Sequence, residues 1–323
     1  MSLSLKELYI LDYFYNRPIE EKVSEYRISQ FGNDYYPLLQ KLILNGYLRI
    51  SNIQEEISML IIPELKTILK TKNLKISGRK NELLSRIFDN FSEKELQIYS
   101  KGKYYVLTNL GKTIIKENEI YILNKDVPYP YPIELLKTTK DKLKIINPNI
   151  SDKEILYYVT CRETEHLLKE KNYFRLRSHL IYEAETSLKL GYSTNSIISY
   201  IQLLTLDISG CSELSKKTSN GIQRYERIQL FPIFLTNIRQ AIIASNISSD
   251  NLNELITKIV NKIINQLPFS YFKSENIILI IKKYINGNII DFSKVKPDNQ
   301  FYIGNDKIDT RRMRSFHQYI YDN

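Results

Sequence analysis

Residues 58–91 read SMLIIPELKTILKTKNLKISGRKNELLSRIFDNF, a stretch that predicts two short helices joined by a basic turn. Apolar residues at helical spacing form a first face, which consists of Leu65, Ile68 and Leu69. A second apolar face follows the turn and consists of Leu83, Leu84, Ile87, Phe88 and Phe91. Two helices this short cannot each bury an apolar face alone. We therefore expect them to pack against each other as a helical hairpin.

The turn between these helices has residue types that suit a phosphate group. We expect Asn73 to end the first helix in a left-handed conformation and the Ser77 hydroxyl to cap the second. A helix N-terminus presents N–H groups and a partial positive charge, and Gly78 would let an anion approach closely. The predicted phosphate-binding residues are Lys70, Lys72, Lys75, Ser77, Gly78, Arg79 and Lys80.

The positive charge of the chain is concentrated in this hairpin. The 323 residues carry a net charge of +10, but abundant Lys, Asn, Ile and Tyr are also typical of AT-rich coding sequence. The difference in net charge between neighbouring segments is therefore more informative than the net charge of the whole chain. Residues 58–91 hold seven basic and three acidic side chains, a net charge of +4, whereas residues 1–54 hold six of each. A local excess of this kind favours a polyanionic or acidic partner.

The stretches on either side of the hairpin predict two strands that belong together. Residues 38–50, LLQKLILNGYLRI, predict a helix that ends at Gly46 and a strand over 47–50. Residues 103–118, KYYVLTNLGKTIIKEN, predict a strand over 103–107 and a helix that starts near Thr108. We expect the two strands to pair antiparallel, with the helical hairpin between them in the sequence.

These flanking stretches resemble the winged-helix pattern, in which a helix leads into a two-stranded wing and then a last helix. A wing normally needs only a few residues between its strands, whereas about fifty intervene here. The resemblance implies a winged-helix-like domain over residues 1–124 that carries an inserted module over 56–92.

The inserted stretch itself resembles the SAP motif, a helix-turn-helix unit of about 35 residues. Residues 60–87, LIIPELKTILKTKNLKISGRKNELLSRI, contain its Pro-Glu-Leu-Lys opening, its Ser-Gly-Arg-Lys joint and its Glu-Leu-Leu run in order. The family usually has Thr or Ser where Ile61 stands and Gly where Asn73 stands. The resemblance, to the bacterial or phage type, implies contact with DNA, often AT-rich, largely through the backbone.

The second half of the chain predicts a separate helical domain. Alternating prolines in residues 125–133, KDVPYPYPI, favour a stiff extended segment, which we interpret as a linker. Helical periodicity dominates residues 134–323, which we interpret as an all-α domain that binds a protein partner or self-associates. The whole chain is thus predicted to be mainly α-helical.

The sequence offers no convincing catalytic, metal or cofactor site. Glu163 and His166 have the i, i+3 spacing of one half of a di-iron site, but a second such motif is absent, so we expect none of the three histidines, His166, His179 and His317, to bind a metal. The basic cluster at Arg311, Arg312 and Arg314 does not match a recombinase set. Two cysteines are too few for a disulfide framework. Without a signal-peptide pattern or an apolar stretch of membrane-spanning length, we expect a cytoplasmic protein that is not an enzyme and does not enter a membrane.

The preferred interpretation is a DNA-binding protein that uses the SAP-like hairpin for backbone contacts. The alternative is a protein-interaction scaffold whose basic hairpin docks an acidic partner. An enzyme with its site in residues 134–323 is a third hypothesis. Binding that strengthens as salt falls, with no acidic protein present, would favour the first.

Overall fold

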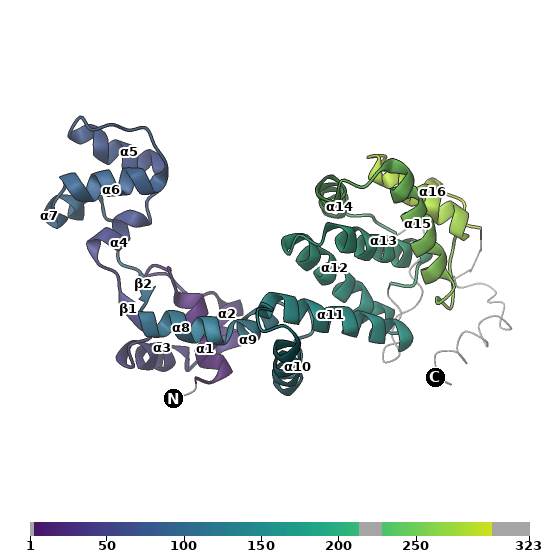
Figure 1. Ribbon diagram of the computed structural model, residues 1–323, viewed down its shortest axis with the longest axis horizontal. Coiled ribbons are helices and arrows are strands. Elements are labelled where there is room, and N and C mark those ends of the chain that lie inside the picture. The colour runs from purple at the N-terminus through teal and green to yellow at the C-terminus, as the bar shows by residue number, and fades with distance from the viewer. Residues whose placement is uncertain (1–2, 213–227, 299–323) are drawn as a thin grey trace. The chain divides into compact units, whose positions relative to one another are not determined.

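The computed structural model describes residues 3–212 and 228–298, and the chain divides into two compact units, residues 1–122 and 123–323. The described part is mainly helical and contains one sheet of two strands, so the predicted mainly α fold is confirmed. Figure 1 labels the elements along the chain. The basic cluster at Arg311, Arg312 and Arg314 and the side chain of His317 lie outside the described residues.

The first unit is built on a helical frame around a two-stranded sheet (Figure 1). Its elements are α1 (Leu5–Phe14), α2 (Glu25–Phe31), α3 (Tyr35–Leu44), β1 (Leu48–Ile50), β2 (Tyr105–Leu107), α8 (Asn109–Glu117) and most of α9 (Glu119–Asn124), which ends in the second unit. Ile10, Leu11, Leu39 and Leu42 are at the centre of its core and are fully buried. This core draws on residues from both sides of the hairpin in the sequence.

The two predicted strands pair antiparallel, as expected. Leu48 lies opposite Leu107, and Ile50 lies opposite Tyr105. Gly46, with φ +74°, ends α3, and the Thr108 hydroxyl accepts a hydrogen bond from the Gly111 N–H at 3.1 Å, which caps α8. At Gly111, α8 passes so close to the chain that a Cβ would lie 2.2 Å from the carbonyl oxygen of Tyr47. Glycine is therefore required for α8 to approach the start of β1.

Between β1 and β2 lies a segment with a core of its own, residues 53–99, which we call the hairpin module. It comprises α4 (Ile53–Ser58), α5 (Ile62–Thr71), α6 (Lys80–Asn90), α7 (Glu93–Leu96) and the 3₁₀ helix η1 (Gln97–Tyr99). Leu65 and Leu69 of α5 and Leu83 and Ile87 of α6 are fully buried in one cluster, so the predicted packing of the two faces is confirmed. The short helices α4 and α7 add further buried apolar residues, Ile53, Ile57 and Leu96.

A network of hydrogen bonds closes the neck where the hairpin module leaves and re-enters the frame. Glu56 is 4% exposed and its carboxylate accepts from Ser51 Oγ at 3.1 Å and from Ser100 Oγ at 2.5 Å. Ser51 Oγ in turn accepts from the Tyr104 N–H at 2.9 Å. The two ends of the insertion are thus tied to each other and to a residue of α4.

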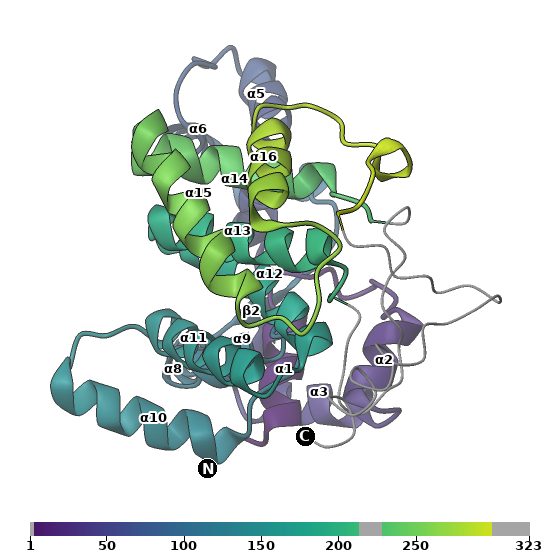
Figure 2. The ribbon, with the colours of Figure 1, turned by 90° about the vertical axis from the view of Figure 1, so that its right-hand side faces the viewer.

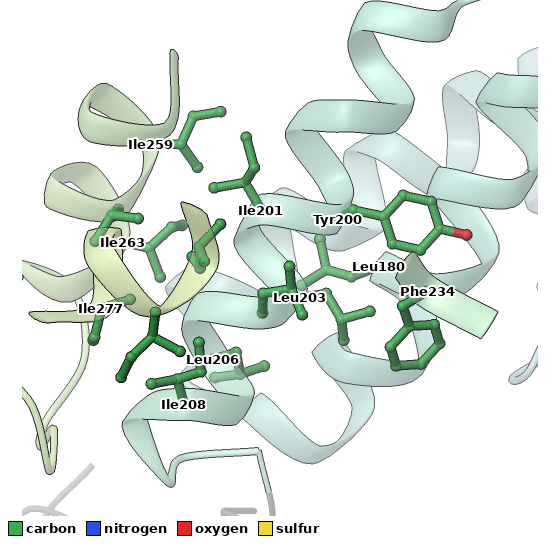
Figure 3. Packing of buried hydrophobic residues seen from close by; sticks show 14 of the residues in the cluster. Leu180, Tyr200, Ile201, Leu203, Leu206, Ile208, Phe234, Ile259, Ile263 and Ile277 are labelled. Carbon is green, nitrogen blue, oxygen red and sulfur yellow. The ribbon is translucent and has the colours of Figure 1, made fainter. Parts of the chain in front are cut away.

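The second unit is helical in its described residues. Its helices are α10 (Ile133–Ile146), α11 (Asp152–Lys169), α12 (Tyr173–Lys189), α13 (Ser193–Ser209), α14 (Pro232–Ser245), α15 (Ser249–Ile264), α16 (Ser274–Ile285) and η3 (Phe292–Lys294). Helix α13 contacts α12, α14, α15 and α16 and is the central helix of the unit (Figure 2). Figure 3 shows Ile201 of α13 beside Ile259 and Ile263 of α15 in this core.

The Pro-rich segment, predicted as a linker, lies within the second unit and packs against its helices α11 and α12. Val127 and Tyr131 are buried, and the Asn124 side chain bonds the backbone of Tyr131 through both its oxygen, at 2.9 Å, and its nitrogen, at 3.0 Å. The Tyr131 hydroxyl lies 3.2 Å from Thr160 Oγ1 and 3.2 Å from His179 Nδ1. Alternating prolines therefore stiffen a segment whose tyrosines are anchored on α11 and α12.

Candidate functional site

The first half of the α5–α6 turn has the geometry that the sequence predicts. Asn73 is left-handed, with φ +54°, directly after the C-terminus of α5. The Leu74 N–H donates to the Leu69 carbonyl at 3.0 Å, and the Asn73 N–H donates to the Lys70 carbonyl at 3.0 Å. This pair of hydrogen bonds is a Schellman motif, and it turns the chain sharply toward α6.

The second half of the turn differs from the prediction, because Ser77 does not cap α6. The helix begins at Lys80 with Arg79 as its N-cap, and Ser77 lies three residues before the first helical residue. The Arg79 side chain has no acceptor for the N–H groups of the first turn. Instead, Glu82 Oε2 reaches back and accepts from the Arg79 N–H at 3.3 Å. Glu64 does the same for the Ile61 N–H of α5 at 2.9 Å, so both helices are capped from inside.

Gly78 is required by the backbone rather than by an approaching anion. Its φ is +129°, a conformation that side-chain-bearing residues rarely adopt, and a Cβ there would lie 2.4 Å from Glu82 Oε2. The Glu82 carboxylate thus lies over the position that the sequence predicts for a phosphate. An anion is better received by the side chains around the turn than at Gly78.

Lys72, one of the predicted phosphate-binding residues, is held in contacts within the hairpin module. Its ammonium lies 2.7 Å from the Asn90 carbonyl oxygen, 2.7 Å from Glu95 Oε1 and 4.3 Å from the centre of the Phe91 ring. The hydrogen bond from Lys72 is the main cause that lowers the pKa of Glu95 to about 2. Lys72 therefore ties the end of α5 to the end of α6 and to α7.

Arg86 positions the turn, a role that our sequence reasoning missed. Its guanidinium donates to the Lys75 carbonyl and lies 3.4 Å from the Ser77 carbonyl oxygen. Arg86 is seven residues after Arg79, which puts it on the same side of α6 as the turn. That spacing is the signal that could have identified it in the sequence.

The remaining cations of the hairpin module are unpaired among the described residues. Lys66 and Lys70 follow each other at one-turn spacing on α5, Lys75, Arg79 and Lys80 surround the turn, and Lys94 lies on α7. None of these six has an ion-pair partner in the described ranges. Lys70, Lys75 and Arg79 are exposed and Lys80 is half-buried, and Ser77 and Gly78 are exposed between them. Glu64 is neutralised by Lys101, which lowers the pKa of that carboxyl. The module thus keeps unpaired positive charge near its turn.

In the part of the chain that the structure describes, no group of three or more His, Cys, Asp or Glu side chains is arranged to hold a metal ion. None of its helices has the length and apolar character needed to cross a membrane.

Comparison with known proteins identifies the hairpin module. Residues 56–87 match the family model of the SAP domain, so the predicted SAP resemblance is confirmed over that stretch. The match covers about a tenth of the chain. No curated protein matches the chain. The SAP domain is in general a DNA-binding module, whereas the winged-helix frame and a bacterial or phage type stay predictions.

Proposed function

We propose that this chain binds duplex DNA through the hairpin module, mainly by contacts to phosphate groups. One observation carries the proposal: a stretch that matches the SAP domain keeps five unpaired cations, three of them around the α5–α6 turn. Each cation that contacts a phosphate releases counterions, which favours binding. A preference for AT-rich sequence belongs to the proposal through the family resemblance.

The structure changes which residues the proposal assigns to DNA. Lys70, Lys75, Arg79 and Lys80 would supply the charge, while Ser77 and Gly78 would shape the turn that presents these side chains. Lys72 would act indirectly, because its ammonium already contacts Glu95 and Asn90. A winged-helix-like frame would present the module, and the second unit would bind a protein partner or a second copy of the chain.

The test is duplex binding by the full chain, with Arg79 and Lys80 replaced together by alanine. We expect weaker binding, because both side chains lack internal ion-pair partners among the described residues and can each contact a phosphate. The slope of log affinity against log salt should fall by about 0.9 for each contact removed, or about 1.8 for two. Fluorescence anisotropy over a series of salt concentrations measures both quantities.

The matched control removes the same charge from the second unit. Lys142 and Lys144 of α10 are exposed, and their joint replacement by alanine should leave the affinity and the salt slope close to those of the parent. Thermal melting of each variant checks that the fold is intact. Equal loss in the two double variants would mean that net charge alone drives binding. An unchanged slope in the Arg79 and Lys80 variant would overturn the proposed interface and favour docking of an acidic protein.

A further inference from the structure

The second unit contains a cavity of about 260 Å³ between α11, α12, α13 and α15. Its lining includes the apolar residues Leu176, Leu180 and Leu206, two of which appear in the core view of Figure 3. The lining also includes polar groups, among them Thr164, Glu183 and Asn195. A concave space with an apolar wall and a few converging polar groups is typical of a small-molecule site.

Glu183 is the unusual member of this lining. Its Oε1 accepts a hydrogen bond from Ser199 Oγ at 2.8 Å, but its Oε2 is buried and has no hydrogen-bond partner among the described residues. Burial raises the pKa of this carboxyl, against the effect of the Thr164 and Ser199 hydroxyls. In this structure the Thr164 hydroxyl donates to the Thr160 carbonyl at 3.0 Å, which leaves Glu183 Oε2 without a donor in the described part of the chain. A buried polar atom without a partner calls for an explanation.

The charges around the cavity define what could satisfy Glu183. Cys161, whose pKa burial raises to about 12, contributes a neutral thiol, whereas the Glu165 carboxylate is exposed and lies at the opening to solvent. The basic residue in the lining, Lys262, is exposed and therefore lies at the opening to solvent. Glu183 is therefore the acidic side chain with a buried oxygen in this lining, while Glu165 and Lys262 carry opposite charges at the opening. A buried acceptor of this kind disfavours an anionic ligand and favours a cationic donor.

We propose that this cavity binds an organic ammonium ion with a short apolar chain, whose N–H group donates to Glu183 Oε2. The ammonium would supply both the missing donor and the opposite charge that a buried carboxylate requires. The apolar chain would lie along Leu176, Leu180 and Leu206. This site is independent of the hairpin module and goes beyond the proposed DNA binding.

Three probes of similar size distinguish the chemistry: hexylammonium, hexanol and hexanoate. Isothermal titration calorimetry on the full chain should show hexylammonium bound at least tenfold more tightly than hexanol, and no binding of hexanoate. Glu183→Gln should reduce hexylammonium to the affinity of hexanol, because the amide keeps the shape and loses the charge. The matched control is Glu185→Gln on the same helix, outside the cavity lining, which should leave all three results unchanged.

Two further measurements place the probe in the cavity. Ile198→Phe adds volume to the lining and should abolish binding of both hexylammonium and hexanol, with melting used to confirm the fold. Of the two cysteines, Cys211 is fully buried, so slow alkylation by a small neutral reagent reports on Cys161, and hexylammonium should slow it at least threefold. The proposal is overturned if no probe binds, as for a cavity that holds only water. It is equally overturned if the ammonium preference survives Glu183→Gln, or if Cys161 is not protected.

Discussion

His179 shows how one buried side chain can make the second unit sensitive to acid. It is fully buried, its ring stacks on Tyr129 with centroids 5.8 Å apart, and its Nδ1 lies 3.2 Å from the Tyr131 hydroxyl. Burial, with a smaller effect from the charge of Arg175, lowers the pKa of His179 to about 4. An unfolded chain binds this proton near pH 6.5. The folded state is therefore expected to lose stability as pH falls from 6.5 to 4.

The magnitude of this loss is at most about 3 kcal/mol, from roughly 2.5 pH units at 1.36 kcal/mol each. Urea unfolding followed by circular dichroism between pH 4 and 7.5 measures it, and His179→Gln should flatten the pH dependence in this window. The raised pKa of Glu183 has the opposite effect, because it favours the folded state as pH falls. Glu183 is present in both the parent and His179→Gln, so its effect cancels when their pH profiles are compared. Identical pH profiles for the parent and His179→Gln would contradict the assignment.

Lys72 and Lys75 show which property of a single residue the sequence could not predict. Lys72 and Lys75 are equivalent cations in the sequence, yet Lys72 is held by Glu95, Asn90 and Phe91 while Lys75 has no ion-pair partner in the described part. The difference depends on α7, whose position follows from tertiary packing rather than from the hairpin pattern. The local excess of positive charge thus identified the basic module in the sequence. It could not show which cations form contacts within the module and which face solvent without an ion-pair partner.

At the level of elements, two substitutions at the C-terminus of α5 should change the stability of the hairpin module in opposite directions. Asn73 adopts φ +54°, which is unfavourable for residues with a Cβ. Asn73→Gly should stabilise the hairpin module by about 0.5–1 kcal/mol, because glycine reaches this conformation without that cost. Asn73→Ala should destabilise it by about 1 kcal/mol. Hydrogen exchange of the α5 and α6 amides measures both changes, and effects of the same sign would contradict the capping role.

The helical elements themselves were largely predictable. The 3–4 spacing of Leu65, Ile68 and Leu69 identified the buried face of α5, and all three are inside the module core. The first residue of α6 was not predicted correctly, because the helix is capped by Glu82 from inside rather than by Ser77 before it. The sequence did not predict α4 and α7, because helices of six and four residues are too short to show a clear helical periodicity.

At the level of the whole molecule, the first unit has two apolar cores that share no residue. The frame core draws on residues before Ile50 and after Tyr104, whereas the core of the hairpin module lies between Ile53 and Tyr99. The ends of the insertion meet at Ser51 and Tyr104, where the Ser51 N–H donates to the Tyr104 carbonyl at 2.9 Å. The sequence predicted this nesting because its two strand signals flank the helical one.

This separation predicts that the frame folds without the hairpin module. Deletion of residues 53–101 joins Asn52 to Gly102 and leaves Asn52, Gly102 and Lys103 as a short hairpin loop between the paired Ser51 and Tyr104. Every buried residue of the frame core remains, and the main loss is the Glu56 network at the neck. Heteronuclear NMR should show the β1–β2 pairing retained, while duplex affinity should fall at least tenfold. If the deleted chain fails to fold, the frame and the module are one cooperative folding unit, and the prediction that the frame folds alone is wrong. If it folds and binds DNA with the parent salt slope, the phosphate contacts lie outside the module, since all of its cations without an ion-pair partner in the described residues have been removed with it.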